Sequence, residues 1–341
     1  MMEKLRIHIM NNRHQAQVYQ AAEEQVRDAV ARNADIADKF AITMGSSEYD
    51  YGRWTDEDLR SYYENMKEAD VLMGYTFPTE NIRGYAPRLK WIHFNSSGVE
   101  QITPFDWVPS GLLLTNSRGV HQPKSGESFA TYLGMLNSAI PKLFTAQRKG
   151  KWERTFTSVI KGRKLVVIGV GCQGGEIARQ GKRLGMRVTG IDPRRASHPE
   201  CDEVLTPDRL PEALKDVDIL AIAAPLTKET YRVIGEKELR MMPASASLLN
   251  VARGQLLDAA ALDRALRAGE LAGAILDVFD NEPLEDESPL WTTPNLIMTP
   301  HVSSDDPINY MPRCLDILMR NIRNRLEGRP LENLVDTGRE Y

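Results

Sequence analysis

A glycine-rich segment constrains the fold of this chain more than any other feature. Residues 169–174 read Gly-Val-Gly-Cys-Gln-Gly, which fits the pattern G-x-G-x-x-G, and an apolar run at 164–168 precedes them. Gly169 permits a tight turn there, Gly171 lets the backbone approach a pyrophosphate, and Gly174 lets a helix pack closely on the strand. The first N–H groups of that helix then point at the phosphates. The segment therefore predicts a strand, a turn and a helix that bind a dinucleotide, rather than a glycine turn without a ligand.

The end of the next apolar run indicates which dinucleotide is bound. Asp192 follows the run at 187–191, at the place where an acidic side chain hydrogen-bonds the ribose hydroxyls of NAD. Its negative charge repels a 2′-phosphate, which favours NAD over NADP. Arg194 and Arg195 follow at once, and their guanidinium groups are suited to bind such a phosphate. NADP therefore stays an alternative, as does the interpretation of both arginines as solvated loop residues.

The composition limits the class of protein. A chain of 341 residues is long enough for about two domains, and its net charge of −4 is unlike the basic surface of a nucleic-acid-binding protein. No apolar stretch approaches the roughly 18 residues of a membrane span, and the first residues do not fit a signal peptide. The three cysteines are too few and too scattered for a disulfide framework or a zinc site. We therefore expect a protein of the reducing cytoplasm, without a metal site and without a nucleic-acid or membrane partner.

Short apolar runs alternate with stretches of helix length in two series. Strands of the first series are expected at 5–10, 40–44, 69–75, 91–94 and 112–115, and those of the second at 164–168, 187–191, 218–223, 246–249, 272–276 and 295–298. Strands separated by helices predict parallel sheets with helices on both faces, which is an α/β fold. Helices are expected at 16–32 and at 121–151, and Pro141 is expected to interrupt the second one.

Two polar residues follow expected strands of the second series. His301 comes after the run at 295–298, and Arg253 comes after the run at 246–249. The carboxyl ends of parallel strands face the crevice in which ligands bind, so both residues are candidates for chemistry. An arginine at such a place needs an anionic partner, which is either a substrate carboxylate or a structural ion pair.

The other candidate residues have ordinary structural explanations. Glu282 lies in an acidic loop that also holds Asp277 and Asp280, and loop acids are most often solvated. His8 and His93 lie inside apolar runs, which favours a packing role for both. From the residues alone, none of these side chains is assigned a function.

Several further motifs follow the glycine loop in the order that one known family shows. They are Ala224-Pro225-Leu226-Thr227-Lys228-Glu229-Thr230, then Asn250-Val251-Ala252-Arg253-Gly254, then residues 276–284 and Thr299-Pro300-His301, and they are flanked more loosely by Ser96-Ser97-Gly98-Val99-Glu100, Glu127 and residues 321–335. The ordered set resembles the D-isomer-specific 2-hydroxyacid dehydrogenase family over nearly the whole chain.

The resemblance implies a division of labour among the site residues. Arg253 would anchor the substrate carboxylate, His301 would be the general acid/base, and Glu282 would bond the other ring nitrogen of His301. Asp277 would meet the nicotinamide carboxamide. The implied cofactor-binding residues are Gly169, Gly171, Cys172, Gln173, Gly174, Asp192, Pro193, Arg194, Ala224, Pro225, Thr230, Val251, Ala252, Asp277 and His301, and the implied substrate-binding residues are Ser96, Ser97, Gly98, Arg253 and His301.

The resemblance also implies an architecture and a reaction. A Rossmann cofactor domain, residues 121–301, would be inserted into a flavodoxin-like substrate-binding domain made of residues 1–120 and 302–341. Both lobes would be doubly wound parallel sheets, and the chain would form a homodimer through the cofactor domain. The expected activity is the NAD(P)-dependent interconversion of a small 2-oxoacid and a D-2-hydroxyacid.

Some alternatives and departures from the family pattern stay open. A corepressor-like NAD sensor shares this fold and can keep the same three polar residues, whereas a formate-type enzyme usually carries glutamine where Glu282 stands. Gln173 replaces an apolar residue, and Glu100 replaces the commoner aspartate. His121 and Arg118 are either substrate contacts or surface residues of the hinge.

Overall fold

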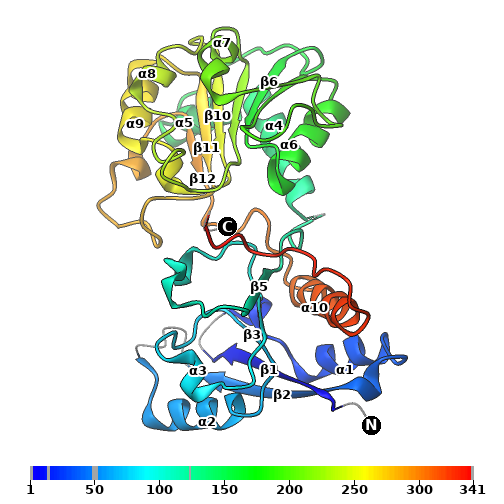
Figure 1. Ribbon diagram of the computed structural model, residues 1–341. Coiled ribbons are helices and arrows are strands. Elements are labelled where there is room, and N and C mark those ends of the chain that lie inside the picture. The colour runs from blue at the N-terminus through cyan, green and yellow to red at the C-terminus, as the bar shows by residue number, and fades with distance from the viewer. Residues whose placement is uncertain (1–2, 14–15, 48–52, 123, 339–341) are drawn as a thin grey trace. The chain divides into compact units, whose positions relative to one another are not determined.

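The computed structural model describes residues 3–13, 16–47, 53–122 and 124–338 (Figure 1). The chain forms two compact units. Unit 1 contains the chain up to His121 and again from Asp305 onward, and unit 2 contains Gln122 to Ser304. The second unit is thus an insertion in the first, and the chain passes between the units twice.

Unit 1 is built on a parallel sheet of five strands (Figure 1). Its order, β2-β1-β3-β4-β5, is that of flavodoxin-like folds. The strands are β1 (Leu5–Asn12), β2 (Phe40–Ser47), β3 (Val71–Gly74), β4 (Trp91–Phe94) and β5 (Leu113–Asn116). The α-helices are α1 (Glu23–Ala31), α2 (Asp56–Met66), α3 (Ile82–Tyr85) and α10 (Tyr310–Leu326), and the short 3-10 helices are η1 (Gln17–Tyr19), η2 (Ala37–Lys39), η4 (Glu100–Ile102) and η5 (Phe105–Trp107).

Unit 2 is built on a parallel sheet of seven strands in the order β12-β11-β10-β9-β6-β7-β8. The strands are β6 (Lys164–Ile168), β7 (Arg187–Ile191), β8 (Glu203–Leu205), β9 (Ile219–Ile222), β10 (Ser247–Asn250), β11 (Gly273–Leu276) and β12 (Leu296–Met298). The helices are α4 (Lys124–Asn137), α5 (Ile140–Arg148), α6 (Cys172–Arg183), α7 (Leu210–Leu214), α8 (Glu236–Leu239), α9 (Ala259–Ala268), η6 (Pro207–Arg209), η7 (Gly254–Leu256) and η8 (Pro289–Thr292). All strands run parallel, and the order in which successive strands are added reverses between β6 and β9, which is the switch point where doubly wound folds bind their ligands.

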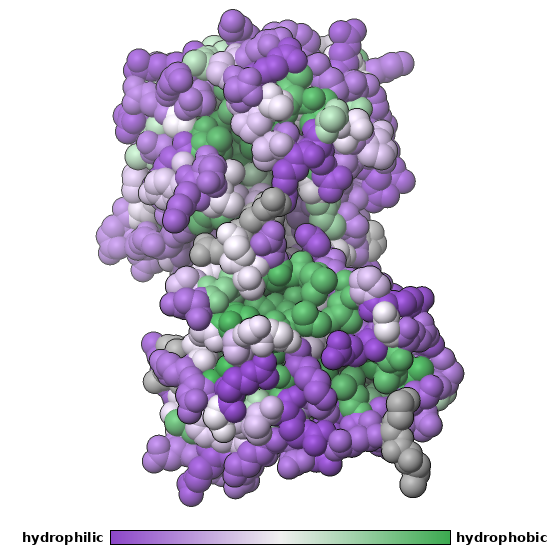
Figure 2. Space-filling model, in the orientation of Figure 1, coloured by the Kyte–Doolittle hydropathy of each residue, from purple (hydrophilic) through white to green (hydrophobic). Residues whose placement is uncertain are grey.

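Successive residues of each central strand face opposite helical layers. In β6, Leu165 and Val167 pack with residues of α4 and α6, whereas Val166 and Ile168 pack with residues of α7 and α9. In unit 1, α1 and α10 cover one face of the sheet, and α2 and α3 cover the other. Apolar side chains therefore fill both faces of both sheets, and hydrophilic residues cover most of the visible surface of each unit (Figure 2).

Most expected elements are present, and the differences have local causes. The helix expected at 16–32 begins only at Glu23, because the Asn11 side chain donates to the Ala21 carbonyl and accepts from the Ala21 N–H. Those two hydrogen bonds lie between the 3-10 helix η1 and α1, where Gln20 and Ala22 have extended backbone angles. The helix expected at 121–151 is divided into α4 and α5, with Pro141 in the first turn of α5 as its missing N–H permits. Strand β8 was not expected from the sequence.

No helix in these described segments is both long and apolar enough to cross a membrane. His8 and His93 are fully buried in the sheet of unit 1, as expected of packing residues. His93 is bonded on both ring nitrogens, 2.8 Å from Thr115 Oγ1 and 3.2 Å from Ser117 Oγ. His8 bonds Thr43 Oγ1 at 2.9 Å. Burial lowers the pKa of His8 to about 4 and that of His93 to about 3.

These two histidines predict a loss of stability in mild acid. Each is neutral in the folded protein but binds a proton in the unfolded chain below its ordinary pKa of 6.5. Above pH 6.5, the free energy of unfolding therefore keeps the full contribution of both histidines. It falls as the pH decreases toward their folded pKa values, by about 2 kcal/mol for each histidine near pH 5. Urea unfolding of wild type and of a His8→Gln variant, between about pH 5 and pH 6.5, measures the slope of the free energy of unfolding against pH. Equal slopes for the two proteins would contradict the assignment.

Candidate active site

The glycine loop joins β6 to α6 in unit 2 and has the geometry that its sequence predicts. Gly169 has a φ of +81°, and a Cβ added to it would lie 2.6 Å from the Cα of Ala224. A Cβ on Gly174 would lie 1.7 Å from the carbonyl oxygen of Gly169. Around the position of a Cβ on Gly171, by contrast, no described atom lies within 4 Å. The loop is thus closed on the side of the strand and open at Gly171, where a ligand can approach the backbone.

Asp192, at the end of β7, connects the glycine loop to the loop that carries the arginines. Its carboxylate is 5% exposed. One oxygen accepts a hydrogen bond from Val170 N at 3.2 Å, and the other accepts from Arg194 N at 2.9 Å and Arg195 N at 3.2 Å. The side chain therefore fixes both loops, and the exposed residues Pro193 and Arg194 extend from it.

The remaining residues expected near a cofactor lie around the same switch point. Cys172 and Gln173 begin α6, and the buried Oε1 of Gln173 has no hydrogen-bond partner in the described structure. After β9, the Thr230 hydroxyl donates to the carbonyl of Pro225 at 2.7 Å and accepts from Thr227 N at 2.7 Å. Thr230 thus closes the turn that follows Ala224.

The loop after β10 carries Arg253 and is held in shape by Asn250. The amide nitrogen of Asn250 donates to the carbonyl of Arg253 at 3.0 Å, and its amide oxygen accepts from Ala252 N at 3.1 Å. Val251 and Ala252 form the turn between them. The Arg253 guanidinium donates to the Ala252 carbonyl at 2.6 Å. The side chain of Asn250 thus bonds both ends of this turn.

Asp277, at the end of β11, organises the loop that carries His301. Its side chain is 2% exposed and accepts hydrogen bonds from the Thr299 hydroxyl at 2.6 Å, Val302 N at 3.1 Å and the Ser303 hydroxyl at 2.5 Å. Its carbonyl accepts from His301 N at 2.8 Å. These bonds hold His301 at a φ of +53°, a conformation that a residue with a side chain rarely adopts.

The side chains of His301 and Glu282 form a hydrogen-bonded pair. His301 Nδ1 lies 2.7 Å from Glu282 Oε2, and the other oxygen of Glu282 accepts from Phe279 N at 2.9 Å. This is the contact that the family resemblance implies, and it leaves Nε2 of His301 as the ring nitrogen directed to other chemistry.

The pair shifts both pKa values in the direction of an ion pair. The hydrogen bond to Glu282 raises the pKa of His301, and this outweighs the opposing effects of burial and of the nearby Arg253 charge. Burial acts to raise the pKa of Glu282, but the hydrogen bonds from His301 and Phe279 bring it below its ordinary value. Asp277 adds a smaller favourable charge for protonated His301. The arrangement therefore favours a protonated imidazole beside an ionised carboxylate.

In unit 1, the loop Ser96-Ser97-Gly98 follows β4, and all three of its carbonyl groups accept hydrogen bonds. The Ser96 carbonyl accepts from Ser117 N at 2.9 Å, the Ser97 carbonyl accepts from the Asn116 side chain at 2.8 Å, and the Gly98 carbonyl accepts from the Ser96 hydroxyl at 2.6 Å. Because each carbonyl is bonded, the direction of the neighbouring N–H groups is set by the fold.

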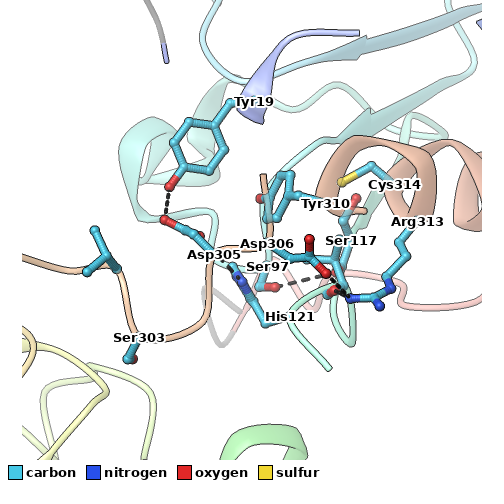
Figure 3. A network of polar contacts seen from close by, with 12 residues as sticks. Tyr19, Ser97, Ser117, His121, Ser303, Asp305, Asp306, Tyr310, Arg313 and Cys314 are labelled. Atoms are coloured by element: carbon cyan, nitrogen blue, oxygen red, sulfur yellow. Dashed lines mark hydrogen bonds and ion pairs between the residues drawn. The ribbon is translucent and has the colours of Figure 1, made fainter. Parts of the chain in front are cut away.

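A polar cluster that the sequence did not reveal lies in unit 1 near this loop (Figure 3). His121 Nδ1 is 3.8 Å from a carboxylate oxygen of Asp305, and the hydroxyl of Tyr19 donates to the same carboxylate. The Tyr310 ring stacks edge-on against Tyr19, and its hydroxyl donates to the Asn95 carbonyl at 2.9 Å. His121 is thus engaged with the residue at which the chain re-enters unit 1. Arg118 is exposed, and its N–H donates to the Asn116 side chain.

The expected site residues belong to two different units of the chain. Arg253, Glu282 and His301 lie in loops after the adjacent strands β10, β11 and β12, in the unit that also holds the glycine loop. Ser96, Ser97 and Gly98 belong to unit 1. In the part of the chain that the structure describes, no group of three or more His, Cys, Asp or Glu side chains is arranged to hold a metal ion.

Sequence reasoning missed the residues that hold His301 in place. Thr299 and Ser303, two residues on either side of His301, both donate to Asp277, and the Tyr132 hydroxyl contacts Thr299 Oγ1 at 3.2 Å. The signal available in the sequence was a pair of hydroxyl residues that flank the candidate histidine symmetrically.

Comparison with known proteins agrees with this geometry. Residues 131–303 match the family described as D-isomer specific 2-hydroxyacid dehydrogenase, NAD binding domain. The chain is 33% identical over 256 residues to a glyoxylate reductase of Thermococcus gammatolerans, which covers 71% of this chain and 75% of the relative. It is 31% identical over 290 residues to a D-3-phosphoglycerate dehydrogenase of Methanocaldococcus jannaschii, which covers 83% of this chain and 54% of the relative.

Solved structures share the fold over the whole chain. The D-isomer specific 2-hydroxyacid dehydrogenase of Xanthobacter autotrophicus Py2, in complex with NADPH and MES, superposes with a TM-score of 0.78 at 25% identity and covers 98% of this chain and 99% of that one. The resemblance noted in the sequence is thereby confirmed. The chain belongs to the D-isomer specific 2-hydroxyacid dehydrogenase family, and it is an oxidoreductase that interconverts a 2-oxoacid and a 2-hydroxyacid with a nicotinamide dinucleotide.

Proposed function

We propose that this chain reduces a small 2-oxoacid of the size of glyoxylate to the D-2-hydroxyacid, with NADH as the reductant and His301 as the proton donor. The observation that carries the proposal is the 2.7 Å contact between His301 Nδ1 and Glu282 Oε2. The substrate size rests on the relatives named glyoxylate reductase, which are 32–33% identical to this chain.

The chemistry needs a proton at one atom and a hydride at its neighbour. A nicotinamide held by the glycine loop of unit 2 would supply the hydride that the carbonyl carbon needs. His301, protonated and held by Glu282, gives its Nε2 proton to the carbonyl oxygen, and such positioned proton transfer contributes about 10²–10⁴ in rate. Arg253 binds the substrate carboxylate through its guanidinium fork, and its positive charge also favours the developing negative charge on the oxygen.

The residues around the glycine loop fit a dinucleotide. The open backbone at Gly171 and the N-terminus of α6 are suited to the pyrophosphate, and Asp192 is suited to the adenosine ribose. The fixed Asp192 carboxylate favours NAD, because it places a negative charge where the 2′-phosphate of NADP would lie. Asp277 remains the residue proposed for the nicotinamide carboxamide.

In unit 1, the ordered N–H groups of the Ser96-Ser97-Gly98 loop are the proposed donors to a substrate carboxylate. The acidic Glu100 follows this loop, and an acidic residue there disfavours a phosphorylated side chain on the substrate.

A homodimer formed through unit 2 is the proposed assembly. The segment between α5 and β6 exposes three large apolar side chains, Trp152 at 94%, Phe156 at 79% and Val159 at 74%. Apolar groups this exposed are typical of a protein–protein interface.

A reducing compartment such as the cytoplasm is proposed because the three cysteines, all within the described residues, form no disulfide.

The proposed reaction predicts the behaviour of a His301→Asn variant. Oxidation of NADH or NADPH is followed with glyoxylate, hydroxypyruvate and 3-phosphohydroxypyruvate as substrates. Wild type should prefer NADH and the unphosphorylated oxoacids, and the variant should lose about 10²–10⁴ in kcat because the proton donor is gone. The Kd of the variant for NADH should be unchanged. A variant with wild-type kcat would remove His301 from the mechanism, and a wild type that binds NADH but turns over no oxoacid would favour the sensor alternative.

The Glu282–His301 pair predicts a pH profile. Reduction needs protonated His301, so kcat/KM should be constant in acid and fall as the pH rises through the raised pKa of His301. In Glu282→Gln the negative charge is absent, the pKa of His301 decreases, and the fall should begin at lower pH. Glu285→Gln is the matched control, because Glu285 is an exposed acid of the same loop that bonds Asn281. An unchanged profile in Glu282→Gln would contradict the proposed pairing in solution.

The exposed segment predicts the effect of removing its apolar side chains. A Trp152→Ser, Phe156→Ser double variant should sediment as a monomer under conditions in which wild type is a dimer, because it loses the two large exposed aromatic side chains of this segment. Trp291→Ser serves as the control, since Trp291 is a half-exposed tryptophan elsewhere in unit 2. Sedimentation velocity measures both. The assigned interface is wrong if the double variant stays dimeric.

A further inference from the structure

The loops that carry Arg253 and Glu282 are tied together by a residue that belongs to neither. Arg232 lies between β9 and α8, and its guanidinium bridges the two loops. One nitrogen donates to the Leu257 carbonyl at 2.5 Å, and the other donates to Asp280 Oδ2 at 2.7 Å. Leu257 belongs to the segment that continues from Arg253, and Asp280 precedes Glu282 by two residues.

The backbone of Arg232 is attached to the first of these loops as well. Arg232 N donates to the Gln255 carbonyl at 2.9 Å, and Ile234 and Leu257 form a parallel β-bridge. The Gln255 side chain in turn donates to the Asp280 carbonyl at 2.9 Å. Arg232 has a φ of +52°, so these contacts hold its backbone in a conformation that it would otherwise rarely adopt. The two loops are thus joined by three hydrogen bonds from two side chains.

The main chains of the loops that carry Arg253 and Glu282 are in direct contact. A Cβ added to Gly254 would lie 2.0 Å from the carbonyl carbon of Phe279, so the two main chains touch at this point. Phe279 N donates to Glu282 Oε1, and Glu282 Oε2 bonds His301. A displacement of Asp280 is therefore transmitted through Phe279 to the carboxylate that orients His301.

The charge of Asp280 makes Arg232 more than a packing residue. Asp280 Oδ1 is buried and has no hydrogen-bond partner, whereas Oδ2 accepts from Arg232. An ionised carboxylate with one unsatisfied buried oxygen depends on a nearby cation. Asp280 is therefore not the freely solvated loop acid that the sequence favours, because Oδ1 is buried and Oδ2 is paired while 36% of the side chain is exposed.

We propose that Arg232 and Asp280 are positioning residues, and that their ion pair sets the spacing between Arg253 and the Glu282–His301 pair. The proposal rests on the proposed function, because it assumes that these three side chains serve catalysis. Arg232 touches neither substrate nor cofactor in this assignment. Its effect is exerted through the two loops, on substrate binding by Arg253 and on the orientation of Glu282.

The proposal predicts two separate effects of Arg232→Met. KM for the oxoacid should rise because the Arg253 loop loosens, and kcat/KM should fall about 10–100-fold, as expected for small displacements of catalytic groups. The decline of kcat/KM with pH should also begin at lower pH. The charged groups that act on the pKa of His301 are Glu282, Arg253 and Asp277, and the variant would displace the first two of them. The Kd for NADH should stay as in wild type.

Matched variants separate positioning from general stability. Arg264→Met, on α9 of the same unit, removes an exposed ion pair to Glu236 on α8 and should leave KM and the pH profile unchanged. Arg232→Lys keeps the charge but only one of the two bridges, and should recover part of the activity and of the pH profile. Asp280→Asn keeps the shape of the side chain but removes its negative charge. It should reproduce the pH profile of Arg232→Met if the ion pair is the cause.

An activity-independent measurement distinguishes this proposal from the proposed function. NMR titration of ¹³C-labelled histidine, with His301 assigned from His301→Asn, follows the His301 imidazole in each variant. A lower titration midpoint in Arg232→Met and Asp280→Asn supports the positioning role even if the substrate assignment fails. If both variants titrate and turn over as wild type does, the positioning proposal is overturned, while the His301→Asn result continues to test the reaction by itself.

Discussion

The buried carboxylate of Asp277 is the interaction on which the geometry of this site depends. It stands at the end of β11 and gathers the hydroxyls of Thr299 and Ser303 and the N–H of Val302, all from the loop after β12. A charge at 2% exposure is costly unless several donors surround it, and here they come from both sides of His301. The loop therefore has one favourable conformation, and in that conformation the imidazole reaches Glu282.

The Glu282–His301 contact contributes to function more than to stability. The His301 side chain is 49% exposed and that of Glu282 is 36% exposed, and ion pairs in contact with water contribute about 0–1 kcal/mol. The loop that carries His301 is held instead by its hydrogen bonds to Asp277, and the Glu282 carboxylate is held by the Phe279 N–H. Buried hydrogen bonds thus fix the loops, whereas the Glu282–His301 pair at their surface remains able to exchange a proton.

The strands of both sheets were largely predictable, because each is a short run of apolar residues between helix-length segments. β4 and β6 have the expected bounds, whereas β8 was missed because its sequence, Glu203-Val204-Leu205, has a single apolar pair at the sheet edge. The late start of α1, at Glu23 instead of near residue 16, could not be foreseen, since it depends on Asn11, which lies on β1 ten residues before its partner Ala21. Local pattern thus predicts the elements, and side-chain bonds between elements set their bounds.

The same distinction explains which parts of the site were accessible to sequence reasoning. Arg253 and His301 were recognisable because each follows a buried strand, where a charged residue has few structural uses. Arg232 and Asp280 gave no such signal, since they are ordinary loop residues 48 positions apart whose partners become visible only in the folded unit. Residues that touch a ligand are marked by the chemistry that they carry. Residues that hold those groups in place are marked only by contacts, so a sequence reveals the former more readily than the latter.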